Sequence, residues 1–157
     1  MLSLCNHGEL RELTVLGRRI GPQIMEAMKE KSPGEDKGSC IVVLATDAPL
    51  SSRQLTRVAR RCAAGLARCG SYWGHGSGDI VIAFSTAQTI KEDESEFVVT
   101  LMMWNEDRLD IIFQAAAEAA EESVLNALCA ARTATGPEGN IRRALCEFAD
   151  ILAADRA

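Results

Sequence analysis

The chain has 157 residues, which is enough for one domain with a substantial hydrophobic core. Its 47% hydrophobic and 25% charged residues are typical of a globular protein, and its net charge of −5 argues against nucleic acid as a partner. It has no run of about 18 apolar residues and no signal-peptide pattern, so we expect no membrane partner and a cytoplasmic location.

Four elements are expected in the first part of the chain: a strand at 10–16, a helix at 20–31, a polar linker at 32–37 and a strand at 40–46. Pro22 favours a helix start, because its fixed φ suits the first turn. The strand at 40–46 is apolar on both faces, which predicts that other layers cover it on both sides.

The rest of the chain predicts a helix to about Arg68, capped by Ser51 or Ser52 and ended by Gly70. Further expected elements are a glycine-rich loop at 71–79, strands at 80–86 and 97–104, a charged loop at 89–96, helices at 109–131 and 141–154, and a glycine loop at 133–140. This order predicts a mixed α/β architecture in which helices cover sheet faces.

The arginines of the first of these helices form one face, which is either a solvated surface or, less in keeping with the acidic balance, a nucleic-acid patch. They are Arg53, Arg57, Arg60, Arg61 and Arg68.

The cysteines show no CxxC pair, and the chain has only two histidines, His7 and His75. Buried free thiols are therefore expected rather than a zinc site, and no cofactor is predicted. The six cysteines are Cys5, Cys40, Cys62, Cys69, Cys129 and Cys146.

Ser39 stands between Gly38 and the apolar strand, directly after the polar linker. Attack of its hydroxyl on the Gly38 carbonyl would move the acyl group from nitrogen to oxygen. Hydrolysis of the resulting ester would free an α-amine, which has an ordinary pKa of about 7.7–8.0 and suits a local base. The alternative is an ordinary polar residue at the start of a strand, which the local sequence alone favours.

Residues 74–79, with the sequence GHGSGD, can bring backbone N–H groups close to a phosphate or an oxyanion. Ser77 and Asp79 are the better site candidates within it, because residues two apart at the start of a strand point to the same side. The loop lacks the lysine of a P-loop, so a tight structural turn is an equal alternative, and a small phosphate- or nucleotide-binding domain is a weaker one. Asn6 is either an oxyanion donor or a turn residue near Gly8.

Two stretches form a specific combination, GSCIVVLATDAPL at 38–50 and GSGDI at 76–80. Other parts of the pattern are Asn6, 13–21, 54–61, 65–68, 83–86, 115–128 and 135–140. As a set they resemble the DmpA-type serine aminopeptidases, the S58 peptidases, which include L-aminopeptidase/D-esterase enzymes and β-peptidyl aminopeptidases.

The resemblance implies an αββα sandwich like that of N-terminal nucleophile hydrolases, and a precursor that cuts itself between Gly38 and Ser39. Ser39 would then be the nucleophile at the new N-terminus. Asn6 would help to stabilise the oxyanion, and Ser77 and Asp79 would hydrogen-bond around the nucleophile and its amine. The substrates would be small peptides, amides or esters cleaved at their N-terminal residue.

By the same resemblance, residues 1–38 correspond to the end of the larger subunit plus linker, and residues 39–157 to the smaller subunit, within one structural domain. Family precursors carry a long segment before the residue that Asn6 matches. We therefore expect this chain to be the C-terminal portion of such an enzyme and to associate with copies of itself or with the missing segment. The competing hypothesis is an inactive remnant or a partner-dependent subunit.

Overall fold

The computed structural model describes residues 1–29 and 38–154. The linker predicted at 32–37 lies outside these residues. The described part of the chain is mixed α/β, as the sequence predicts.

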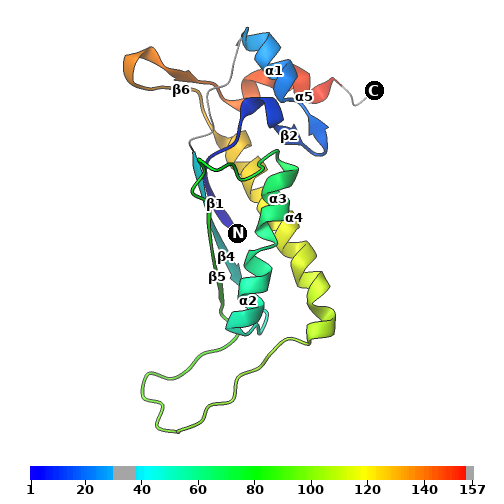
Figure 1. Ribbon diagram of the computed structural model, residues 1–157. Helices are drawn as coiled ribbons and strands as arrows, with labels where there is room; N and C mark the ends of the chain where they lie inside the picture. The colour runs from blue at the N-terminus through cyan, green and yellow to red at the C-terminus, as the bar shows by residue number, and fades with distance from the viewer. Residues whose placement is uncertain (30–37, 155–157) are drawn as a thin grey trace.

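The centre of the fold is a three-stranded sheet in the order β1-β4-β5 (Figure 1). β4 (Ser39–Thr46) and β5 (Ile80–Ser85) confirm the two predicted apolar strands and run parallel. β1 (Leu2–Asn6), which the sequence analysis missed, pairs antiparallel with the other edge of β4. The strand that carries Ser39 is therefore the central one.

Helices cover one face of this sheet (Figure 1). α2 (Ser52–Ala59) and α3 (Cys62–Arg68) form the crossover from β4 to β5, and α4 (Leu109–Ala130) packs against α3. The expectation that β4 is covered on both sides is wrong for the described residues. Exposure alternates along β4, because the helices lie on one side only.

The main core lies between this helix layer and the sheet. It includes Val42 and Leu44 of β4, Leu66 of α3, and Ala120 and Val124 of α4. A second, smaller cluster joins Ile20 and Ile24 to Leu145, beside the end of the sheet that carries Asn6 and Ser39.

The predicted strand at 10–16 is wrong. A 3₁₀ turn, η1 (Leu10–Glu12), is followed by a hairpin of two short strands, β2 (Thr14–Val15) and β3 (Arg18–Arg19). Both turn residues of the hairpin have positive φ, Leu16 at 50° and Gly17 at 79°, which is the geometry of a tight type I′ connection. The predicted helix at 20–31 is confirmed as α1 (Gly21–Met28), which a left-handed Lys29 ends.

The single helix predicted up to Arg68 is two helices, because a tight i→i+3 bond from the N–H of Arg61 to the carbonyl of Val58 separates α2 from α3. Ser51 is the N-cap of α2, and Gln54 completes its capping box. Gly70 ends α3 with a φ of 102°, as predicted.

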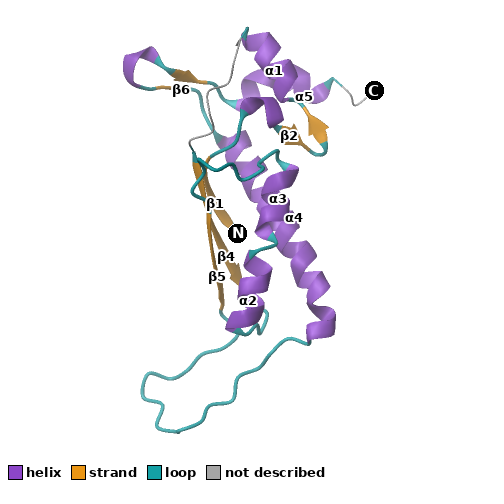
Figure 2. Ribbon diagram, in the orientation of Figure 1, coloured by secondary structure: helices purple, strands orange, loops and turns teal. Residues whose placement is uncertain are grey.

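The strand predicted at 97–104 is not formed. This segment belongs to a long loop that leads away from the sheet (Figure 2). The 3₁₀ turn η2 (Glu106–Arg108) then leads into α4, which confirms the predicted helix at 109–131. Phe97 is fully exposed, because no strand of the described chain lies beside it.

The predicted helix at 141–154 is also wrong in its first half. The predicted loop at 133–140 holds β6 (Ala134–Thr135) and the 3₁₀ turn η3 (Pro137–Gly139), and β6 pairs with β7 (Ile141–Arg142). Only the end is helical, as η4 (Leu145–Phe148) and α5 (Ala149–Ala153).

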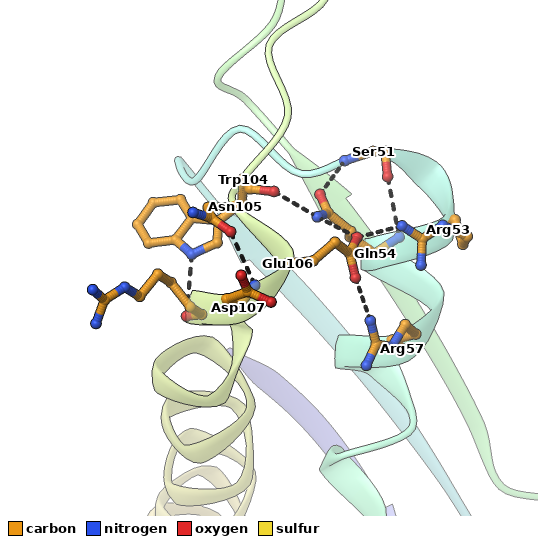
Figure 3. A network of polar contacts seen from close by, with 9 residues as sticks. Ser51, Arg53, Gln54, Arg57, Trp104, Asn105, Glu106 and Asp107 are labelled. Carbon is orange, nitrogen blue, oxygen red and sulfur yellow. Dashed lines mark hydrogen bonds and ion pairs between the residues drawn. The ribbon is translucent and has the colours of Figure 1, made fainter.

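A polar network fixes the end of the long loop against α2 (Figure 3). The buried Gln54 amide donates to the carbonyl of Trp104 and to Glu106, both at 2.8 Å. Glu106 also pairs with Arg53 and Arg57. Two of the five arginines of the predicted arginine face, Arg53 and Arg57 of α2, are therefore paired with Glu106.

The remaining contacts of that face are with α4. The Arg57 and Arg61 guanidinium groups lie over the Phe113 ring, and Arg68 pairs with Glu121. Within the described residues, no helix is long and apolar enough to cross a membrane.

Candidate functional site

Asn6 and Ser39 lie directly opposite each other, as the last residue of β1 and the first residue of β4. Side chains at directly opposed positions of a sheet project from the same face. Both residues are exposed on the face that the helices leave uncovered. The structure therefore brings together the predicted nucleophile and the predicted oxyanion donor, although 32 positions of sequence separate them.

Gly38 packs so closely on β1 that no side chain fits there. A Cβ at this position would lie 1.6 Å from the carbonyl oxygen of Asn6. The φ of Gly38 is not in the left-handed region, so the reason for glycine is close backbone approach and not an unusual dihedral angle. The Gly38–Ser39 bond is thus held against the backbone of Asn6.

Ser77 and Asp79 form a connected pair beside this bond. The Ser77 hydroxyl lies 3.0 Å from both carboxylate oxygens of Asp79, to which it donates. Asp79 Oδ1 also accepts a hydrogen bond of 2.9 Å from the backbone N–H of Cys40. Because this N–H belongs to the peptide that follows Ser39, the carboxylate fixes the orientation of the Ser39–Cys40 peptide plane.

Gly78 leaves room for the Ser39 side chain. A Cβ at Gly78 would lie 3.3 Å from Ser39 Oγ, which is tighter than ordinary packing. The loop before it is closed by a bond of 2.9 Å from the N–H of Ser77 to the carbonyl of Gly74, whereas His75 is exposed. The loop at 74–79 is therefore a tight structural turn, and it also places Ser77 and Asp79 beside Ser39, so the two alternatives do not exclude each other.

The opposite face of the same strand pair carries a cluster that the sequence analysis missed. Cys5 and Cys40 are directly opposed, their sulfur atoms are 4.0 Å apart, and His7 offers a ring nitrogen within 4.8 Å of both. Apolar and polar residues alternate at the start of Leu2–Asn6, which is a pattern typical of a strand. A strand there places Cys5 and Asn6 on opposite faces, so this pattern could have indicated the cluster.

Burial favours the protonated, neutral form of the two thiols in this cluster. Burial, together with the neighbouring Cys5 and Asp79, raises the pKa of Cys40 to about 12. Burial also raises the pKa of Cys5, while its hydrogen bond with Cys40 acts in the opposite direction. All six cysteines are free, as expected, but Cys129 and Cys146 are exposed and not buried.

The sequence profile of peptidase family S58 matches residues 1–142. This chain belongs to peptidase family S58. A curated relative, the β-peptidyl aminopeptidase BapA of Sphingosinicella microcystinivorans, is 38% identical over an alignment of 151 positions, which covers 88% of this chain and 38% of that protein.

Solved S58 structures have the same fold. The L-aminopeptidase D-Ala-esterase/amidase of Ochrobactrum anthropi, described as a variant of the N-terminal nucleophile hydrolase fold, superimposes with a TM-score of 0.81 at 36% identity. The match covers 97% of this chain and 42% of that one. A β-aminopeptidase of Burkholderia sp. also gives 0.81, at 31% identity, over 99% of this chain and 44% of that one.

These matches confirm the predicted fold class. The chain spans about two fifths of the length of the S58 proteins that it matches. In the described residues, the fold is represented by one three-stranded sheet with a helix layer on one of its faces, and by two short two-stranded sheets.

Proposed function

We propose that this chain is the nucleophile-bearing part of a self-processing serine aminopeptidase, with Ser39 as the nucleophile. The observation that carries the proposal is the register that sets Asn6 opposite Ser39, with Asp79 bound to the next backbone N–H. Membership of family S58 supports the same chemistry.

The first step is intramolecular. Ser39 Oγ attacks the carbonyl carbon of Gly38, the C–N bond breaks, and the acyl group passes to the hydroxyl oxygen as an ester. Breaking the C–N bond frees the α-amine of Ser39, and water then hydrolyses the ester, which leaves a carboxylate on Gly38 and restores the Ser39 hydroxyl. The Asn6 amide, as an N–H donor beside the reacting carbonyl, stabilises the negative charge that develops on the carbonyl oxygen.

In the processed enzyme the same groups act on a substrate. The α-amine of Ser39 takes the proton from the hydroxyl of the same residue. The hydroxyl oxygen then attacks the carbonyl carbon of the substrate's N-terminal residue. Asp79 and Ser77 keep the backbone around Ser39 in place through their hydrogen bonds. The substrate class is a small peptide, amide or ester with a free N-terminus, in line with the names of the relatives.

Intact-mass analysis of the purified chain tests the proposal. We expect the chain to separate on incubation into residues 1–38 and 39–157, whereas Ser39→Ala stays whole. A chain that stays intact and behaves like Ser39→Ala would contradict self-processing. Hydrolysis of aminoacyl amides by the processed protein, absent in Ser39→Ala, would then establish the aminopeptidase activity.

A second candidate is a subunit that is inactive until a partner layer covers its sheet. The exposed face of the sheet is apolar, with Leu4 70%, Ile80 55% and Ile82 54% exposed, and it is the face that carries Ser39. The S58 relatives contain more than twice the length matched here, and a second sheet from such additional chain fits an apolar sheet face. An intact, self-associating chain without amidase activity favours this candidate, and turnover that Ser39→Ala abolishes excludes it.

A further inference from the structure

The strand pair that carries Ser39 has a second set of converging side chains, on the face that the helices cover. Cys5 and Cys40 are paired in the β1–β4 register, and their sulfur atoms are 4.0 Å apart. The ligand atoms of Cys5, His7 and Cys40 all lie within 4.8 Å of one another. Cys40 is fully buried and the other two residues are partly buried, so the cluster is an interior one.

One group in this cluster is not satisfied by the protein. The Nδ1 atom of His7 is buried and has no hydrogen-bond partner. A buried polar atom without a partner costs about 1–3 kcal/mol, so its retention needs a reason. A bound cation would supply one, because imidazole nitrogen is a common metal ligand.

The sulfur separation is that of two free thiols joined by a hydrogen bond, and it also suits a shared metal ion. A disulfide requires the sulfur atoms to approach to about 2.05 Å. Two thiolates on one tetrahedral zinc ion, each at about 2.3 Å from it, lie about 3.8 Å apart. The observed 4.0 Å is close to the metal-bound separation and about twice the disulfide bond length.

The backbone also suits a clamp between the strands. The N–H of Cys40 points to Asp79, on the β5 side, so Cys40 and Cys5 form a pair without mutual backbone hydrogen bonds. Such pairs bring the two side chains closer together than hydrogen-bonded pairs do. The thiols therefore face each other from adjacent strands in a geometry that needs little rearrangement.

We propose that Cys5, His7 and Cys40 form a binding site for a thiolate-preferring divalent cation of the Zn²⁺ class. Two thiolates and one neutral imidazole are three of the four ligands of a tetrahedral site, as in Cys₂His zinc centres, and leave one position for water or another ligand. On binding, two S–H protons leave to solvent and two sulfur–metal bonds form, so the charge of the ion is neutralised by the two thiolates.

The site would fix the register that the proposed nucleophile depends on. Cys5 precedes Asn6, and Cys40 follows Ser39, so one ion joins the chain on both sides of the Gly38–Ser39 bond. The metal lies on the opposite face of the strands from the Ser39 side chain, which makes it a structural clamp and not a reaction partner. Binding of the ion does not require the proposed self-processing, so either can fail without the other.

Binding is expected to strengthen steeply with pH. Thiols bind a metal as thiolates, so each S–H proton must be displaced by the metal. Displacement of two protons predicts about a hundredfold gain in affinity per pH unit. Asp79, beside Cys40, raises that thiol's pKa but also attracts the cation, and the neighbouring Cys69 is the other titratable group coupled to Cys5.

Titration of the full chain with Co²⁺, under reducing conditions, tests the site. We expect one equivalent to give thiolate-to-cobalt charge-transfer absorption and Zn²⁺ to displace it, with no competition from Mg²⁺. Loss of an outer-shell partner weakens metal binding by about 10–100-fold, so loss of a direct ligand in Cys5→Ser should cost more than about a hundredfold. His7→Gln, which leaves both thiols in place, should keep the absorption but weaken binding.

The matched control is the double variant Cys129→Ser with Cys146→Ser. Both cysteines are exposed, and their removal should leave the Co²⁺ absorption and the Co²⁺ affinity unchanged. Folding of every variant is checked by circular dichroism, and His7→Gln keeps the test valid if Cys5→Ser does not fold. The proposal is overturned by absent charge-transfer absorption, by equal affinity in wild type and His7→Gln, or by a Cys5–Cys40 disulfide that persists in reductant.

Discussion

The carboxylate of Asp79 is the residue on which the geometry around Ser39 depends most directly. It accepts hydrogen bonds from the Cys40 N–H at 2.9 Å and from the Ser77 hydroxyl at 3.0 Å. Hydrogen bonds to a charged acceptor contribute about 1.5–3 kcal/mol each, more than those between neutral groups. The negative charge, and not only the shape of the side chain, is therefore expected to matter.

Asp79→Asn tests that role. The amide keeps one acceptor oxygen but loses the charge, so we expect about 1–2 kcal/mol less stability in urea unfolding. Because the peptide after Ser39 is then held less firmly, we also expect the proposed cleavage at Gly38–Ser39 to slow about tenfold, which corresponds to about 1.4 kcal/mol of barrier.

Asp47→Asn removes the same charge at an exposed turn position and serves as the control. Equal urea midpoints and equal cleavage rates for the two variants would show that the contacts of Asp79 do not position Ser39.

At the scale of elements, the packing of α3 on α4 depends on small residues. Gly65 of α3 faces the backbone of α4, and a Cβ there would lie 2.2 Å from the carbonyl of Ala117 and 2.6 Å from the Cβ of Ala120. The small alanine side chains of α4 allow α3 to approach closely at this point. The sheet-covering layer is thus held at a distance that only glycine permits.

Gly65→Ala is expected to lower stability although alanine is the better helix former. The propensity gain is about 1 kcal/mol, whereas overpacking of a tight interface costs about 1–3 kcal/mol and the overlap here is with rigid backbone. We expect a net loss in urea unfolding. Ala64→Gly, at an exposed neighbouring position, measures the propensity effect alone. A stabilised Gly65→Ala variant would contradict the close contact.

Elements with a strong local pattern could be predicted from the sequence, and those defined by a distant partner could not. The apolar run of β4 and the long alanine-rich α4 were found within one residue. The apolar segment 97–104 was expected to be a strand, but a strand needs a neighbour to bond to, and the described chain places none beside it. β1, a strand of five residues, was missed although its exposure alternates, and its partner β4 lies more than 30 residues further along the chain.

The site shows the same division. Ser39, Ser77 and Asp79 could be singled out from their local sequence, because a junction serine and a glycine loop are visible patterns. The opposition of Asn6 to Ser39, and of Cys5 to Cys40, depends on the β1–β4 register. No local pattern contains that register. Asn6 was therefore left open between an oxyanion donor and a turn residue until the resemblance was considered, and the cysteine–histidine cluster was not predicted at all.

At the scale of the whole molecule, the sheet has one face under helices and one open to solvent (Figure 1). The open face carries large apolar residues from all three strands, namely Leu2, Leu4, Ile41, Ile80, Ile82 and Phe84. Contiguous apolar surface of this kind marks an interaction face or an association hazard. The chain by itself is therefore expected to self-associate through this face.

Substitution of the open face separates association from folding. In Leu4→Thr with Ile82→Thr, the β-branched side chains keep strand propensity while they reduce apolar surface. We expect fewer high-mass species in sedimentation velocity and a stability within about 0.5 kcal/mol of wild type, as for surface substitutions. Val42→Thr, on the helix-covered face of the same sheet, is the matched control: its buried hydroxyl should cost about 1–3 kcal/mol. If the double variant instead loses as much stability as Val42→Thr while its sedimentation is unchanged, the open face is part of the folded interior and the proposed partner layer has no surface to cover.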